Sequence, residues 1–115
     1  MVHVLIIDST SKSTSNLKKK LTAVQFILSI HVASEAEGIK WMTKHTFDFV
    51  IHRVAMPAMG TNLNLKERHP ETPLFVVPTF SYEEEGRDEE ERHIVQDIIP
   101  KIIQRQWQQT LSHQE

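Results

Sequence analysis

The chain of 115 residues contains no cysteine, only three glycines and a single tyrosine. Without cysteine it can form no disulfide and carry out no thiolate chemistry, which fits a reducing compartment. The three glycines, Gly38, Gly60 and Gly86, lie far apart and form no loop of the kind that cradles the phosphates of a nucleotide. Two common classes of functional site are therefore not indicated.

An excess of charge of one sign and long apolar runs are also missing. The net charge is −2, and no segment approaches the roughly 18 apolar residues that a membrane span needs. The apolar run at the N-terminus is too short for a signal peptide and has no basic residues before it. We expect a cytoplasmic protein with no nucleic-acid or membrane partner, built as one domain over residues 1–110 with a tail at 111–115.

Short apolar runs rich in β-branched residues alternate with helical patterns along residues 1–80. Leu17, Leu21 and Val24 mark one face of a first helix, and Ser34 with Glu37 forms a capping box that predicts a helix over 35–44. Residues 62–70 allow at most two helical turns. The predicted strands are Val2–Asp8, Phe26–Val32, Phe47–His52 and Pro73–Pro78.

The last third of the sequence allows two interpretations. The run Glu83–Arg92 is almost wholly charged and predicts either a fully solvated helix or a loop. The apolar residues between Ile94 and Trp107 fit one long amphipathic helix kinked at Pro100. They fit equally a fifth strand followed by a helix with Pro100 in its first turn. The alternation of strands and helices favours the strand followed by a helix.

This alternation predicts an α/β protein, a three-layer doubly wound structure with a mostly parallel sheet and helices on both faces. Such sheets bind ligands and react at the carboxyl ends of their strands. In this sequence those ends are Asp8, Arg53 and Pro78. Arg53 is unexpected, because a cation at the end of a buried strand is costly unless it is paired.

Three motifs carry a resemblance to a known family: "VLIID" (Val4–Asp8), "FDFVIHRVAMPAMG" (Phe47–Gly60) and "ERHPETPLFVV" (Glu67–Val77). From Val4 to about Ile103 the chain resembles the receiver domain of response regulators. The resemblance implies a five-stranded parallel sheet of order 2-1-3-4-5, with the third helix shortened and the fourth atypical in this chain. It also implies a family chemistry in which a histidine kinase transfers a phosphoryl group to an aspartate at the end of the third strand.

The resemblance places that chemistry at positions where this sequence departs from the family. Asp8 matches one of two acidic residues that hold Mg²⁺, but Ser9 stands at the second. Arg53 stands at the phosphoacceptor aspartate. The family's hydroxyl residue and lysine fall on Pro78 and Pro100. A hydroxyl and a lysine do follow these two prolines directly, at Thr79 and Lys101. The degenerate phosphorylation pocket therefore consists of Asp8, Ser9, Arg53, Pro78, Thr79 and Lys101.

These departures remove the groups that phosphoryl transfer needs. Mg²⁺ requires oxygen ligands and anionic partners, an acyl phosphate requires a carboxylate nucleophile, and a guanidinium supplies neither. We expect a stand-alone pseudo-receiver with no enzymatic activity, metal or cofactor, which acts by protein–protein recognition in two-component-type signalling. The alternatives are a phosphorylatable regulator that uses Asp48 or His52, and a sensor of a small ligand at the strand ends.

Two further predictions concern Arg53 and the partner. Arg53 is expected either to pair with Asp8 across the strand ends or to extend into solvent while Asp8 caps the following helix. The resemblance implies a partner surface on the fourth helix, fifth strand and fifth helix. It would bind a signalling component, such as a histidine kinase or an output protein, or a second copy of the chain. The residues predicted for this surface are Ile94, Ile98, Lys101 and Trp107.

Overall fold

The structure is a computed structural model that describes residues 1–8, 14–55, 63–79 and 84–113. Its backbone groups into two compact units, Met1–Phe80 and Ser81–Glu115. The predicted single domain over residues 1–110 stays a prediction. The elements of the first unit are β1 (Val2–Asp8), α1 (Thr14–Thr22), β2 (Ile27–Val32), α2 (Glu35–Lys44), β3 (Phe49–Ala55), α3 (Leu63–Arg68) and β4 (Leu74–Thr79).

The described strands of the first unit form a four-stranded parallel sheet of order β2-β1-β3-β4. β1 lies between β2 and β3, with Val4 opposite Phe49 and Asp8 opposite Arg53. This confirms the predicted α/β class, the parallel sheet and the order of its first four strands. Parallel neighbours require a crossover connection, which α1, α2 and α3 provide.

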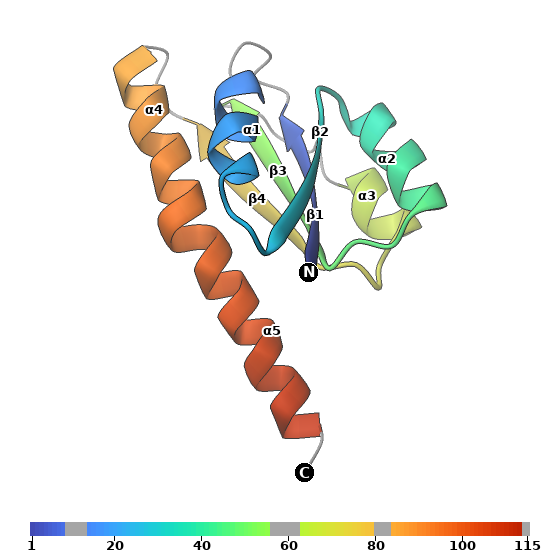
Figure 1. Cartoon of the computed structure of the whole chain (residues 1–115). Coiled ribbons are helices and arrows are strands. Elements are labelled where there is room, and N and C mark those ends of the chain that lie inside the picture. Colours follow the sequence, from blue (N-terminus) through green and yellow to red (C-terminus); the bar gives the residue numbers. More distant parts are fainter. Residues whose placement is uncertain (9–13, 56–62, 80–83, 114–115) are drawn as a thin grey trace. The chain divides into compact units, whose positions relative to one another are not determined.

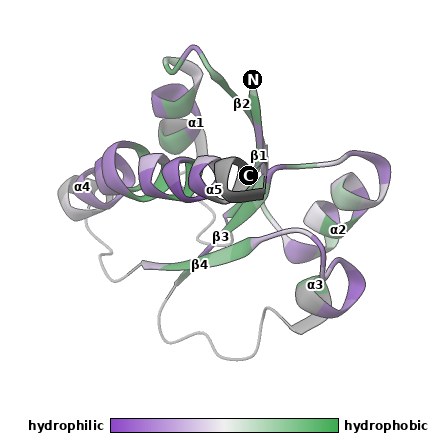
Figure 2. Cartoon of the chain, turned by 90° about the horizontal axis from the view of Figure 1, so that it is seen from below, coloured by the Kyte–Doolittle hydropathy of each residue, from purple (hydrophilic) through white to green (hydrophobic). Residues whose placement is uncertain are grey.

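Helices lie on both faces of this sheet. Figure 1 shows α2 and α3 on one side of the strands and α1 on the other. Leu5, Ile7 and Val50 belong to a buried cluster with residues of α2 and α3, so alternation along each strand turns Val4, Ile6, Phe49 and Ile51 toward α1. Both faces are therefore apolar along the middle of the sheet, and Figure 2 shows part of β3 in the hydrophobic colour.

Helix α2 begins and ends where its sequence predicts. The Ser34 side chain accepts a hydrogen bond from the Glu37 backbone N–H at 3.2 Å, which satisfies one of the free N–H groups of the first turn. Gly38 is buried against β1, and a Cβ atom there would lie 2.5 Å from Cδ1 of Ile7. Glycine therefore allows the helix to lie close to the sheet at this point.

The bounds of two strands differ from the prediction in a way that matters for the site. β3 does not stop at His52 but continues through Arg53 to Ala55. The predicted end at His52 was wrong, because the charged residue Arg53 was assumed to end the apolar run. Arg53 pairs with Asp8, so the strand continues through it. β4 runs from Leu74 to Thr79, one residue later at each end than predicted, so it continues past Pro78. A strand tolerates proline only at an edge or bulge, since proline has no N–H to donate.

The second unit is helical throughout its described part. α4 (Glu84–His93) is followed by a π-helical turn, η1 (Ile94–Ile98), and by α5 (Ile99–His113). The predicted fifth strand is therefore wrong at residues 94–98, and the alternative of helix through this region is the one observed. The N–H of Ile99 donates to the carbonyl of Ile94, five residues earlier. This wider turn precedes Pro100, whose ring and missing N–H disturb a regular α-helix.

The charged run forms α4, so the helical interpretation of residues 83–92 is the one observed in the described part. Arg92 and Asp88 form an exposed ion pair at 2.7 Å, one helical turn apart. The prediction of full solvation was wrong, because Glu91 is buried. No helix in the described part of the chain combines the length and the apolar character that a membrane crossing requires.

Candidate functional site

Asp8 and Arg53 form a buried ion pair at the carboxyl ends of β1 and β3. They lie opposite each other in the parallel register, on the face of the sheet that α1 covers. Nη1 of Arg53 lies 3.4 Å from Oδ2 of Asp8, and both side chains are 0% exposed. The predicted ion pair is confirmed. The alternative, in which Arg53 extends into solvent, is wrong.

Burial decides what this pair can do. Each charge loses its hydration, and the attraction between them offsets that cost only while both are present. At 3.4 Å the contact is longer than the 2.7–2.9 Å typical of a charge-assisted hydrogen bond, so electrostatic attraction contributes more than directional bonding. Either charge without the other would be strongly unfavourable at this place.

His31 lies on the same face of the sheet as this pair. It is opposite Ile6 in the register of β2 and β1, and Ile6 points to the same side as Asp8. Burial, assisted by the charge of Lys18, lowers the pKa of His31 to about 4, although the Asp8 charge opposes the shift. One ring nitrogen, Nε2, lies 3.0 Å from Oγ of Ser29. The imidazole is therefore neutral at pH 7.

The sequence interpretation did not single out His31. The signal that could have identified His31 is its place inside a predicted strand. Side chains alternate between the two faces along a strand, and His31 lies opposite Ile6, so it points to the same face as Asp8. The strand pattern alone does not supply the register between β1 and β2, so this signal was incomplete. The position became evident only when the register was known.

The two proposed alternative phosphoacceptors lie away from the ion pair. His52 is inside β3 and buried, and it points to the opposite face from Arg53 because successive side chains of a strand alternate. Asp48 lies at the amino end of the sheet, where its Oδ2 accepts a hydrogen bond from the His3 N–H at 2.7 Å. His3 and Asp8 are five residues apart along β1, a distance of roughly 17 Å.

The other residues of the predicted pocket are dispersed or not described. Ser9 lies outside the described residues. Pro78 is exposed and opposite Val54, on the face away from Arg53, and Thr79 ends β4 opposite Ala55. Lys101 is exposed on α5, so it does not follow a strand as the resemblance implied. Of the six pocket residues, the structure thus brings Asp8 and Arg53 into contact.

The residues predicted for a partner surface differ in exposure. Ile94 is buried, Ile98 is partly exposed, and Lys101 is exposed on α5. Trp107 has 67% of its surface exposed, which is unusual for an indole ring. Ile94 therefore cannot contribute to a surface in this conformation, and the role of the other three residues stays a prediction.

The described part of the chain holds no group of three or more His, Cys, Asp or Glu side chains arranged as they would be around a metal ion. At the carboxyl ends of the strands, the carboxylate of Asp8 already faces a guanidinium. A divalent cation placed there would be repelled by Arg53.

Comparison of the chain with protein-family models, with curated protein sequences and with solved structures gives no significant match. The likeness to receiver domains therefore depends on the sequence motifs, and its functional implications are treated below as proposals.

Proposed function

We propose that this chain is a receiver-like module of the flavodoxin-like type, which takes part in two-component-type signalling by binding a protein partner, without enzymatic activity and without phosphorylation on aspartate. The observation that carries the proposal is the Arg53–Asp8 contact at 3.4 Å in a fully buried position. By the resemblance, this is where a receiver would hold Mg²⁺ beside its phosphoacceptor. The strand order β2-β1-β3-β4 agrees with the first four strands of that fold.

The charge of Arg53 supports the loss of phosphorylation. A receiver needs two or more anionic ligands for Mg²⁺ and a carboxylate to attack the phosphorus atom. Here the Asp8 carboxylate faces a guanidinium, and by the resemblance that guanidinium stands at the position of the nucleophile. Asp48 lies at the other end of the sheet and His52 on its other face, so neither replaces the missing acceptor at this site.

A permanent ion pair has a consequence for signalling. A phosphoryl group switches a protein by binding one of two conformations better than the other. Arg53 and Asp8 are present together at all times, so they favour one conformation without any modification. We propose that a cytoplasmic signalling component, such as a histidine kinase or an output protein, binds that conformation.

The test is incubation with acetyl phosphate and Mg²⁺, followed by intact-mass measurement. We expect no gain of a phosphoryl group by the natural chain. We also expect none by Arg53→Asp alone, because Ser9 and Pro78 still lack the metal ligand and the hydroxyl. The quadruple variant Arg53→Asp, Ser9→Asp, Pro78→Thr, Pro100→Lys restores the acceptor, the second acidic residue, the hydroxyl and the lysine, and is the matched control. A phosphorylated peptide containing Asp48 or His52 in the natural chain would contradict the proposal.

A further inference from the structure

The two edges of the described sheet are not alike. β2 pairs with β1 on one side and forms one edge, and β4 forms the other. Natural edge strands are protected from pairing with other strands by charges, prolines or bulges. β4 carries Pro78, but the sequence of β2, "ILSIHV", contains neither proline, glycine, lysine nor an acidic residue. The edge of β2 can therefore accept another strand.

Exposed apolar side chains gather beside the β2 edge. Leu28, which is 47% exposed, points to the side of the sheet that α2 covers, because its parity along β2 matches that of Ile30. Phe26, which is 55% exposed, lies in the turn directly before β2. Trp41 of α2 is also exposed. Together they are three of the six large apolar side chains that are exposed in the described part of the chain. Large exposed apolar side chains beside an open sheet edge suit an interaction surface.

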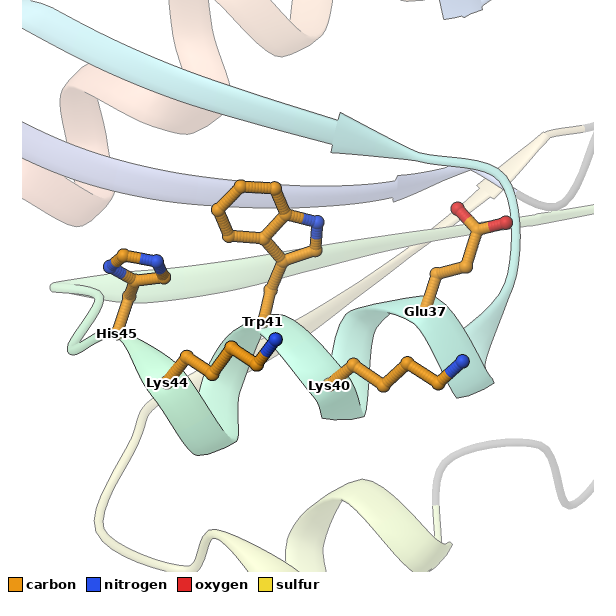
Figure 3. A pocket seen from close by; sticks show the side chains of 5 residues that line it. All are labelled: Glu37, Lys40, Trp41, Lys44 and His45. Carbon is orange, nitrogen blue, oxygen red and sulfur yellow. The ribbon is translucent and has the colours of Figure 1, made fainter.

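A groove of about 470 Å³ lies along α2 at this place, lined by Glu37, Lys40, Trp41, Lys44 and His45. Figure 3 shows Glu37, Trp41 and His45 projecting from α2 toward the strands, with the β2 strand above them. The rings of Trp41 and His45 lie 5.1 Å apart. The groove therefore has an aromatic centre, with Glu37 toward its first end, Lys44 and His45 at the other, and Lys40 directly before the indole.

The charges at the two ends of α2 are complementary to those of a second α2 that runs in the opposite direction. The acidic residues, Glu35 and Glu37, are in the first turn, and Lys44 is in the last. Glu37 and His45 are each four residues from Trp41, a rise of about 6 Å in either direction. A second α2 running the opposite way would place its basic end against Glu37 and its acidic end against Lys44, with the two Trp41 side chains meeting at the centre.

We propose that this surface, made of β2 and α2, joins two copies of the chain in a homodimer with two-fold symmetry. In a two-fold interface the same patch meets itself, so the patch must be self-complementary. The two β2 strands would pair antiparallel and continue the sheet from one copy into the other. The partner's Lys44 and His45 would lie against Glu37, and the partner's Glu37 against Lys44 and His45.

The spacing of the layers permits the strand and helix contacts together. Paired strands lie about 4.8 Å apart, and packed helices lie about 8–10 Å apart, so one helix covers two strands. α2 packs on β1 and β2. In the continued sheet, the two α2 helices would cover adjacent pairs of strands and so lie at packing distance from each other.

The charge pattern favours a second copy over an unrelated peptide. A purely acidic segment would match Lys40 and Lys44 but would be repelled by Glu35 and Glu37, and a purely basic segment would meet the reverse conflict. A reversed copy of α2 satisfies both ends. It also buries Trp41 at the centre, where aromatic residues contribute most to binding.

The experiment measures the dimerisation of the full chain by sedimentation equilibrium over a range of concentrations. We expect the natural chain to dimerise, with Trp41→Ala, Leu28→Lys, Glu37→Lys and Lys44→Glu each raising the dissociation constant by roughly tenfold or more. Circular dichroism and unfolding midpoints identify any variant that loses its fold. Val76→Lys on β4 and Lys19→Glu on α1, which change exposed residues outside both proposed surfaces, are the matched controls and should leave dimerisation unchanged.

A charge-swap mixture gives the decisive result. Glu37→Lys and Lys44→Glu chains each carry two like charges at the interface and should be monomeric alone. Mixed together they should form a heterodimer, because each basic end then meets an acidic end. A natural chain that stays monomeric to about 100 µM, a mixture that does not associate, or a dimer that is disrupted by Trp107→Ala but not by Trp41→Ala would each overturn the proposal.

Discussion

The two ends of the sheet hold one aspartate each, in opposite surroundings. At the amino end, Asp48 is exposed and accepts a hydrogen bond from the His3 N–H at 2.7 Å. At the carboxyl end, Asp8 is fully buried and faces Arg53 at the longer distance of 3.4 Å. The shorter contact is the less important one for stability, since water can replace it. The longer contact is not replaced so easily, because both side chains are fully buried and a buried charge that loses its counter-charge is costly.

The largest effect is expected from breaking the buried pair. Arg53→Met removes the cation that faces the Asp8 carboxylate, and Asp8→Val removes the anion that faces the guanidinium. Each single variant should lower the free energy of unfolding by about 3–5 kcal/mol in urea titrations. The double variant puts apolar groups at both positions, so its loss should be much smaller than the sum of the single losses.

The matched control for this cycle is a pair of residues in the same register that do not interact as charges. Ile6 and Ile51 lie two residues before Asp8 and Arg53 and on the same face of the sheet. Ile6→Val and Ile51→Val should each lower the free energy of unfolding by about 1 kcal/mol. The result that would contradict the comparison is a strictly additive double variant of Asp8 and Arg53, which would mean that the two charges do not stabilise each other.

An intermediate effect is expected from acid, through His31 near the carboxyl end. The pKa of His31 is about 4 in the folded chain and 6.5 when the ring is not buried. The unfolded chain therefore binds a proton at His31 more readily than the folded chain does. The stability that His31 contributes is therefore fully present above pH 6.5 and is lost as the pH falls toward 4. Between pH 7 and pH 5 the loss should be about 1–2 kcal/mol, after allowance for the partial exposure of the ring.

The measurement is the difference between the natural chain and His31→Gln in urea unfolding at pH 7 and pH 5. The difference isolates His31 from the other histidines, and NMR titration of the ring gives its pKa directly. In Asp8→Asn the pKa of His31 should fall further, because the Asp8 charge raises it. A titration of His31 near pH 6.5 would show that burial does not hold the ring neutral.

The smallest effect is expected at the amino end. Asp48→Ala removes the acceptor of the His3 N–H, and water then takes its place. The loss in free energy of unfolding should be about 0.5–1 kcal/mol, and Asp48→Asn, which keeps an acceptor oxygen, should stay close to the natural chain. A loss at Asp48 as large as that at Asp8 would mean that burial does not distinguish the two ends of the sheet.

Much of the first unit could be predicted from local patterns. The strand Val2–Asp8 and the helix Glu35–Lys44 were predicted with their observed bounds, because an apolar run and a capping box are signals that neighbouring residues provide by themselves. The fifth strand could not be predicted correctly, since the apolar spacing around Pro100 fits a helix and a strand equally. The charged residue Glu91 lies in a run that predicts solvent exposure, yet it is buried.

What the sequence by itself determined is therefore the class of the fold, the order of strands and helices through residues 1–79, and the presence of a cation where a strand should be apolar. Only the tertiary structure decided that β3 passes through Arg53, that Asp8 and Arg53 meet with both charges out of water, and that His31 shares their face. The physical reason is that a side chain's surroundings depend on the register between strands distant in sequence, which no local pattern of residues specifies.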